Sequence, residues 1–121
     1  MKVLIVEDNS INRELLDLMV VRLNHETVLA KNGKEAILVA KKEHPDLVLM
    51  DLRMPELDGF DATVALKKDS QTKDIPVIAV SANSSDEDIK KAIQSGCIKY
   101  IPKPVNMKEL ENVLSKYSAK K

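Results

Sequence analysis

Five short apolar runs, separated by longer amphipathic segments, constrain the fold of this chain more than any other feature of its sequence. The runs span residues 3–6, 27–30, 46–50, 76–80 and 98–101. Each run is too short for a helix, and residues 47–50 and 77–80 are apolar at every position. Such runs are typical of strands buried on both faces, as in a parallel sheet that helices cover.

The segments between the runs carry the start and stop signals of helices. Pairs with capping-box spacing occur at three predicted helix starts: Asn32 with Glu35, Ser84 with Glu87, and Asn106 with Glu109. Gly96 follows residues 86–95 at the place where a left-handed residue would end a helix. Strand and helix therefore alternate five times, which predicts a single doubly wound α/β domain with right-handed crossovers.

Length and charge limit the number of domains and the kinds of partner. The 121 residues suit one domain, 1–121, with a core over about 2–116 and a frayed tail at 117–121. Lysine plus arginine number 19 and aspartate plus glutamate number 19, so there is no basic field for direct nucleic acid binding. The single cysteine, Cys97, and the lack of a leader or a spanning apolar stretch predict a cytoplasmic protein without a membrane segment.

Polar residues follow four of the predicted strands. Glu7 and Asp8 follow the first strand, Asp51 the third, Ser81 the fourth and Lys103 the fifth. In an open parallel sheet, ligands bind outside the carboxyl ends of the strands, near the point where the strand order reverses. The sequence therefore predicts one site that contains three carboxylates, a hydroxyl and an amine.

This pattern resembles the receiver domain of two-component response regulators, over residues 2 to about 116. The matching elements are the paired acids 7–8, Asp51 followed by residues 54–55 and Gly59, Ser81 with the alanine after it, and Lys103 with the proline after it. The resemblance implies a flavodoxin-like (βα)5 sandwich, with a five-stranded parallel sheet in the order 2-1-3-4-5. It also implies a signalling switch that is phosphorylated stoichiometrically on Asp51 and later dephosphorylates itself, in place of enzymatic turnover.

The resemblance also assigns roles to the site residues. It implies that Mg²⁺ is held by Glu7, Asp8, Asp51 and the backbone carbonyl of Arg53, in keeping with the preference of this ion for oxygen ligands. Lys103 and Ser81 would contact the phosphoryl group, and a carboxylate attacks such a group efficiently only when cations neutralise its oxygens. The remaining implied roles are a switch formed by Ser81 and Tyr100, and tuning of the phosphoryl lifetime by Arg53 and Asn83.

The implied partners are proteins. A phosphohistidine on a sensor histidine kinase or on a phosphotransfer protein would supply the phosphoryl group, and a downstream protein would bind the switched surface. The chain is expected to act as a stand-alone regulator, either as a monomer or as a phosphorylation-dependent dimer.

Other functions stay open at this point. Each site residue by itself is often structural, since residues such as Asp8 and Asp51 commonly cap helices or stabilise turns, and their joint placement is what favours a phosphorylation site. One alternative is a receiver-like interaction module that needs no phosphorylation. Another is a phosphatase with an aspartate nucleophile, but such enzymes normally carry a general acid two residues after that aspartate, where this chain has Arg53.

The first predicted helix, about residues 9–23, is apolar over more than one stripe. We expect Ile11, Leu15, Leu18 and Met19 to face the sheet, with a flank formed by Leu16, Val20 and Leu23. The flank would either dock a partner or belong to a broad face packed on the core.

Overall fold

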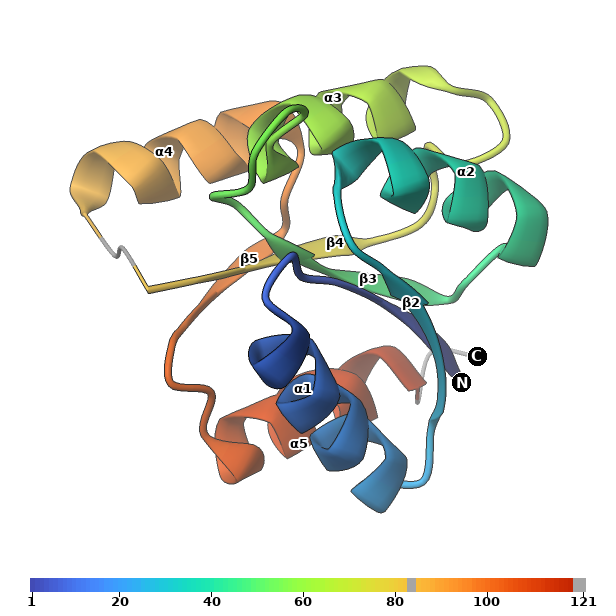
Figure 1. The fold of residues 1–121 in the computed structure, drawn as a ribbon, viewed down its shortest axis with the longest axis vertical. Helices are drawn as coiled ribbons and strands as arrows, with labels where there is room; N and C mark the ends of the chain where they lie inside the picture. The colour runs from blue at the N-terminus through green and yellow to red at the C-terminus, as the bar shows by residue number, and fades with distance from the viewer. Residues whose placement is uncertain (83–84, 119–121) are drawn as a thin grey trace.

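The computed structural model describes residues 1–82 and 85–118, and in this part of the chain five strands alternate with five helices (Figure 1). The strands are β1 (Lys2–Val6), β2 (Glu26–Ala30), β3 (Leu47–Asp51), β4 (Val77–Ser81) and β5 (Lys99–Pro102). The helices are α1 (Ser10–Arg22), α2 (Gly33–Glu43), α3 (Gly59–Lys68), α4 (Asp86–Ser95) and α5 (Met107–Ser118).

The strands form one parallel sheet in the order β2-β1-β3-β4-β5, which confirms the predicted fold and strand order. The two fully apolar runs lie in β3 and β4, and every residue of these two strands is buried. The edge strands β2 and β5 are more exposed: the only buried residues are Ala30 in β2 and Ile101 in β5, because each strand lies at the margin of the sheet, where the helices cover it less completely.

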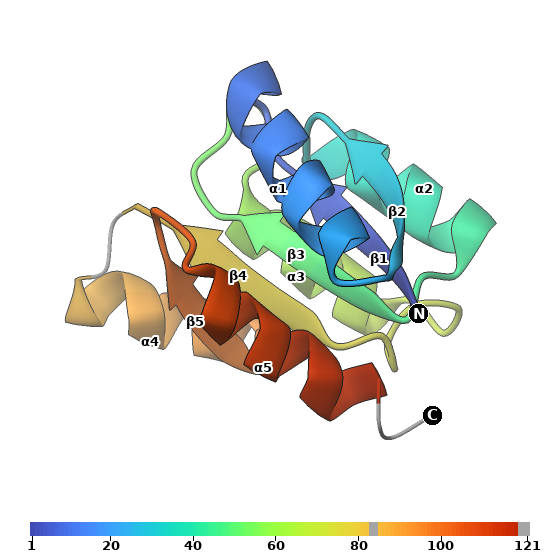
Figure 2. The same cartoon turned by 90° about the horizontal axis from the view of Figure 1, so that it is seen from below.

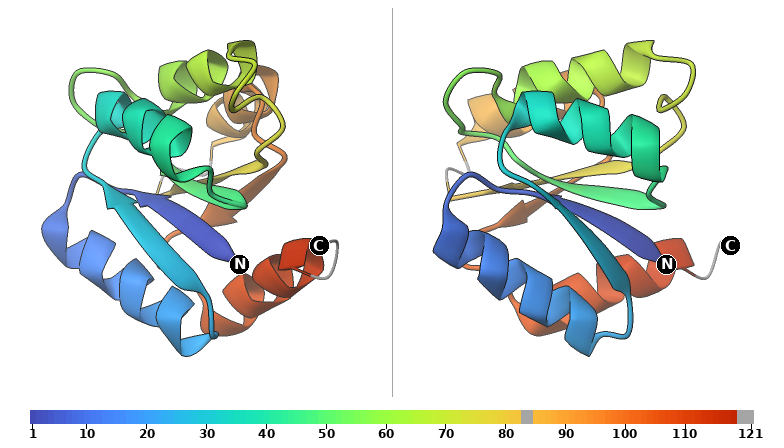
Figure 3. Two further views of the ribbon diagram at one scale, coloured as in Figure 1. Left: turned by 90° about the vertical axis from the view of Figure 1, so that its right-hand side faces the viewer. Right: turned by 45° about the vertical axis from the view of Figure 1, so that its right-hand side comes forward.

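Helices cover both faces of the sheet and give the molecule three layers. Helices α1 and α5 lie on one face, and α2, α3 and α4 lie on the other (Figures 1 and 3). Viewed from below, α1 and α5 both lie in front of the sheet (Figure 2). Each face has its own apolar core: Leu16, Ile78 and Leu110 belong to the core under α1 and α5, whereas Val48 and Phe60 belong to the other.

The predicted helix starts are confirmed at two of three places. The side chain of Asn32 accepts a hydrogen bond from the backbone of Glu35 (2.8 Å), and that of Asn106 accepts one from Glu109 (3.1 Å). The prediction for α4 was wrong by one residue, since its N-cap is Ser85, which accepts from the backbone of Asp88. Two successive serines each have an acidic residue three positions later, so the pattern does not distinguish them.

The C-terminal helix extends further than the sequence indicated. Helix α5 continues through Ser118, and Tyr117 packs against the core under α1 and α5. Residues 117 and 118 are therefore helical, although they were predicted as part of the frayed tail, and the rest of that tail lies outside the described residues.

The predicted sheet-facing side of α1 was wrong in part. Its buried residues are Leu16, Met19 and Val20, whereas Ile11, Leu15 and Leu18 are 74%, 55% and 64% exposed. The helix carries two apolar stripes, and tertiary contacts select between them. Arg13 donates to the backbone carbonyl of Glu7 (2.8 Å), and Thr27 donates to Asp17 (2.6 Å). Both hydrogen bonds form in the rotation that packs Leu16, Met19 and Val20 into the core.

Candidate functional site

The polar residues predicted to share one edge of the sheet do so. Asp51 ends β3 and Ser81 ends β4, while Glu7 with Asp8 follows β1 and Lys103 follows β5. Because β1, β3, β4 and β5 are consecutive neighbours and parallel, their carboxyl ends form one continuous edge. The sheet thus brings together residues that are up to 96 positions apart in the chain.

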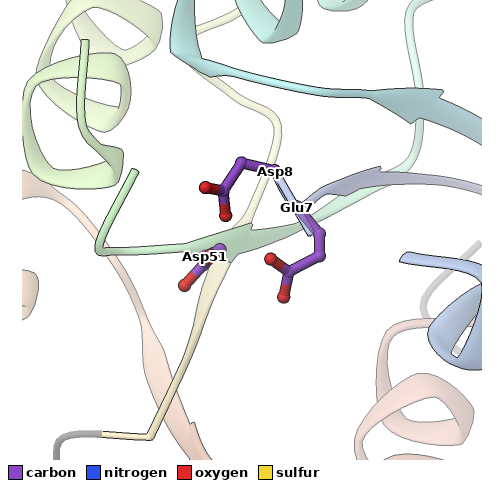
Figure 4. A group of neighbouring side chains, drawn as sticks. All are labelled: Glu7, Asp8 and Asp51. Atoms are coloured by element: carbon purple, nitrogen blue, oxygen red, sulfur yellow. The ribbon is translucent and has the colours of Figure 1, made fainter. Parts of the chain in front are cut away.

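The acidic cluster, which we define as Glu7, Asp8 and Asp51, has a carboxylate oxygen from each residue within 4.8 Å of the others. Figure 4 shows the three side chains gathered at the ends of β1 and β3. Glu7 and Asp51 are buried and Asp8 is exposed, so the cluster lies at the wall of an open cavity of about 340 Å³. Clustered carboxylate oxygens are the ligands that Mg²⁺ prefers, and these residues therefore fit a magnesium site.

Lys103 lies between two of these acids and is closer to Glu7. Its Nζ atom is 2.5 Å from Oε1 of Glu7 and 3.6 Å from Oδ1 of Asp51. The other carboxylate oxygen of Glu7 accepts a hydrogen bond from the backbone N–H of Asn9 (3.1 Å). Glu7, which is 1% exposed, thus has donors on both oxygens, which is what a buried carboxylate requires.

Burial and the neighbouring charges move the pKa values of the cluster in opposite directions. Burial, followed by the adjacent Glu7, raises the pKa of Asp51 to about 7, although the Lys103 charge and a hydrogen bond with the Arg53 backbone act to lower it. Burial also opposes ionisation of Glu7, but hydrogen bonds with Lys103, Asp51 and Asn9 outweigh it and leave the pKa of Glu7 lowered. The pKa of Lys103 is raised, because its contacts with Glu7 and Asp51 outweigh burial. Asp51 therefore holds the proton more readily than Glu7 does.

Two further residues hold the backbone at this edge. The amide of Gly59, the first residue of α3, donates to the carbonyl of Leu52 (3.0 Å), and a Cβ atom at Gly59 would overlap the carbonyl oxygen of Asp51. Only glycine allows α3 to begin so close to Asp51. Arg13, whose guanidinium contacts the carbonyls of Glu7 and Asp8, was not singled out by the sequence analysis. Its position six residues after Glu7, on the next helix, was the available signal.

The other predicted residues surround this cluster. Ser81 is 1% exposed, and its carbonyl accepts from the backbone N–H of Lys103 (2.9 Å). Tyr100 is half-buried in β5 and packs against the core under α2, α3 and α4. Arg53 lines the same cavity as Asp51. The remaining predicted residue, Asn83, lies outside the described residues.

The side chain of Arg53 has a partner that the sequence analysis missed. Its Nη2 atom donates to both carboxylate oxygens of Asp88 in α4, at 2.6 and 2.8 Å. The two residues are 35 positions apart, and no local pattern links them.

Comparison with known proteins points to one family. The profile of the response regulator receiver domain matches residues 3–115. The polar-differentiation response regulator DivK of Brucella ovis is 38% identical over 115 residues, which are 95% of this chain and 94% of that protein. The same identity and coverage hold for DivK of Brucella anthropi.

Solved structures of receiver proteins superpose closely on this chain. The receiver domain of a sensor histidine kinase from Pseudomonas aeruginosa, which has a magnesium ion coordinated in its active site cleft, has a TM-score of 0.89 and is 32% identical, with 96% of this chain and 95% of that chain covered. The chemotaxis protein CheY4 of Vibrio cholerae has a TM-score of 0.89 at 28% identity, with 96% and 97% covered. Within residues 1–82 and 85–118, none of the helices has the length and apolarity to cross a membrane.

Proposed function

The chain belongs to the family of response regulator receiver domains, which act in two-component signalling, and from this premise we propose that Asp51 is its phosphoacceptor. The donor is a phosphohistidine of a sensor histidine kinase or of a phosphotransfer protein. The observation that carries the proposal is the convergence of Glu7, Asp8 and Asp51 within 4.8 Å, with the Lys103 amine in contact with two of them.

In the proposed reaction, a carboxylate oxygen of Asp51 attacks the phosphorus atom. The P–N bond to the donor histidine breaks, and the imidazole nitrogen leaves with the electron pair. Water later attacks the phosphorus of the acyl phosphate, which releases inorganic phosphate and restores the Asp51 carboxylate. Each phosphorylation of the protein is therefore stoichiometric.

Residues of the chain supply the electrostatic support for this step. Lys103 lies 3.6 Å from Asp51 and can donate to a phosphoryl oxygen. The acidic cluster and the backbone carbonyl of Arg53 would hold Mg²⁺, which neutralises phosphoryl oxygen charge when bound. The raised pKa of Asp51 means that its proton must leave before it attacks, and a nearby cation favours that loss.

The switch that follows phosphorylation would run through Ser81 and Tyr100. Ser81 ends β4 beside the cavity, and its hydroxyl can donate to a phosphoryl oxygen. Tyr100 lies on the neighbouring strand, where the backbone of β5 pairs with β4. Movement of Ser81 toward the phosphoryl group would change the packing beside Tyr100 and so alter a surface that a downstream protein binds.

The exposed apolar side of α1 is the proposed docking surface for the phosphodonor. Ile11, Leu15 and Leu18 are each more than half exposed. Leu15 also lines an apolar cavity of about 360 Å³, together with Pro104 and Val105 of the loop after β5. This cavity shares Glu7 and Lys103 with the phosphorylation site, so a protein seated on α1 would bring its histidine to the acidic cluster.

The two alternative functions are less well supported. A phosphatase of the aspartate-nucleophile class needs an acid two residues after Asp51, but Arg53 stands there and its guanidinium is paired with Asp88. An interaction module that never accepts phosphate would not require buried Glu7 and Asp51 beside one another, an arrangement that costs free energy. We place the reaction in the cytoplasm, on the argument from Cys97 given above.

Incubation with acetyl phosphate or phosphoramidate and Mg²⁺ tests the proposal directly. We expect intact-mass spectrometry to show one added phosphoryl group. This group should be absent when EDTA is added before the donor. Asp51→Asn is expected to remove the adduct, and Asp8→Asn to reduce it. Equal labelling of wild type and Asp51→Asn would refute the assignment of the phosphoacceptor.

A further inference from the structure

The side chain of Arg53 points to α4, although its backbone lies at the phosphorylation site. Arg53 is the second residue after Asp51, and its Nη2 atom donates to both oxygens of Asp88 at 2.6 and 2.8 Å. The guanidinium also lies 5.5 Å from the centre of the Phe60 ring. The Arg53–Asp88 ion pair is a contact between the loop that joins β3 to α3 and the first turn of α4.

The two members of the pair differ in burial. The side chain of Asp88 is 9% exposed, whereas that of Arg53 is 57% exposed. A buried carboxylate depends on a cationic partner, because an unpaired buried charge is costly, whereas an exposed guanidinium can be satisfied by water. The pair therefore matters more to Asp88, and to the first turn of α4 that carries it, than to Arg53.

A second anion, Asp51, lines the cavity that the residue Arg53 also lines. This is the cavity of about 340 Å³ at the sheet edge. A phosphoryl group on Asp51 carries close to two negative charges on three acceptor oxygens, in place of the single charge of the carboxylate, and this is more than the single charge of Asp88. Planar guanidinium groups recognise phosphoryl oxygens well. One guanidinium would then have two competing acceptors.

We propose that Asp88 is a positioning residue, which holds the Arg53 guanidinium on α4 and away from Asp51 until a phosphoryl group competes for it. This inference rests on the proposed function of Asp51. It adds a second connection between the phosphorylation site and α4, separate from the one through Ser81 and Tyr100.

Competition for one guanidinium must act in both directions. If Asp88 weakens the interaction of Arg53 with a phosphoryl group, then a phosphoryl group weakens the Arg53–Asp88 pair by the same factor. Phosphorylation would thus leave Asp88 buried without its cation and loosen the first turn of α4. Lys91, which lies 4.4 Å from the centre of the same Phe60 ring, adds a like charge near Arg53 and opposes its retention on α4.

The test is a double-mutant cycle that uses beryllofluoride with Mg²⁺ as the phosphoryl mimic, with binding followed by amide chemical shifts. Asp88→Asn keeps the shape of the side chain and removes its charge. We expect it to lower the half-saturating concentration of the mimic by about fivefold or more. In the Arg53→Gln background the same change is expected to have an effect of less than twofold. Asp86→Asn, which removes an equal charge from an exposed position in the same turn, is the matched control and is expected to leave the affinity within twofold of wild type.

Each outcome decides a separate point. The inference is overturned if Asp88→Asn binds the mimic no more tightly than wild type, or if the gain is as large in the Arg53→Gln background or in Asp86→Asn. Failure of wild type to bind the mimic at all would instead overturn the proposed function, and this inference with it.

A second measurement does not require that Asp88→Asn folds. Hydrogen exchange of the amides of Asp88 and Ile89 is expected to speed up several-fold when the mimic binds wild type. In Arg53→Gln these amides are expected to exchange fast with or without the mimic. Unchanged exchange in mimic-bound wild type would contradict release of Asp88.

Discussion

Replacing Asp51 with asparagine is expected to stabilise the protein in EDTA, and most strongly above neutral pH. Burial and Glu7 raise the pKa of Asp51 from its ordinary 3.8 to about 7. The unfolded chain loses this proton near the ordinary value, so between about pH 4 and 7 the native state binds more protons, and its stability falls as pH rises. The lowered pKa of Glu7 acts at the acid end of this range, because the stability that it adds is present above the ordinary 4.5 and is lost as pH falls further.

The size of the effect follows from the shift. Each pH unit across that window costs at most about 1.4 kcal/mol, so a shift of about three units sets an upper limit of roughly 4 kcal/mol. Relaxation of Lys103 and shielding by solvent reduce this to about 1–2 kcal/mol. Asparagine keeps the shape of Asp51, cannot ionise, and can donate to Glu7 in place of the proton. At roughly 4 °C per kcal/mol for a domain of this size, Asp51→Asn should melt about 4–8 °C above wild type at pH 8.5, and about 1–3 °C above it at pH 5, where only about a third of the window has been crossed.

Thermal melts at both pH values in EDTA provide the assay, and Asp8→Asn provides the control. Asp8→Asn removes an equal charge from the exposed member of the acidic cluster, and its melting temperature should change between the two pH values by the same amount as that of wild type. Saturating Mg²⁺ at pH 8.5 should narrow the gap between wild type and Asp51→Asn, because the ion stabilises the site that binds it. A lower melting temperature for Asp51→Asn at pH 8.5 would refute the reasoning, and so would a gap of the same size at both pH values.

Three further outcomes are expected. Lys103→Met leaves Glu7, which is 1% exposed, without its cation, and should cost about 3 kcal/mol in urea unfolding; a loss below about 0.5 kcal/mol would show that the pair is dispensable. Ser81→Ala should still be labelled by acetyl phosphate, whereas its amide shift response to beryllofluoride near Tyr100 should fall by half or more; a full response would remove Ser81 from the switch. Leu15→Ser changes a 55% exposed side chain, so its stability should stay within about 1 kcal/mol of wild type, while phosphotransfer from a cognate kinase slows roughly tenfold and labelling by acetyl phosphate does not change. Equal slowing of both reactions would place Leu15 outside the docking surface.

The order of elements and the edge that bears the site could be predicted because both depend on local signals. Residues 77–80 are apolar at every position, and this pattern is visible in the sequence without knowledge of the residues that pack around the strand. Asn32 caps α2 by accepting a hydrogen bond from a backbone N–H only three residues away. Parallel strands then carry Asp51 and Ser81 to one edge, because every strand of such a sheet ends on the same side.

Features that depend on contacts between distant segments could not be predicted in this way. The sequence of α1 contains two apolar stripes, and packing against side chains of the sheet and of α5 decides which of them is buried. Lys103 is nearer to Glu7 than to Asp51, although Glu7 is 96 positions away in the chain, and no local pattern encodes these distances.

The sequence by itself determined which residues form the acidic cluster and on which edge of the sheet they lie, since the periodicity of the strands follows from neighbouring residues and the resemblance to receiver domains implied the strand order. The tertiary structure alone decided how strongly these groups interact. The raised pKa of Asp51 comes from burial beside Glu7, and the place of the Arg53 guanidinium comes from Asp88. Electrostatic free energies depend on distance and burial in three dimensions, and neither quantity is encoded in a local pattern of residues.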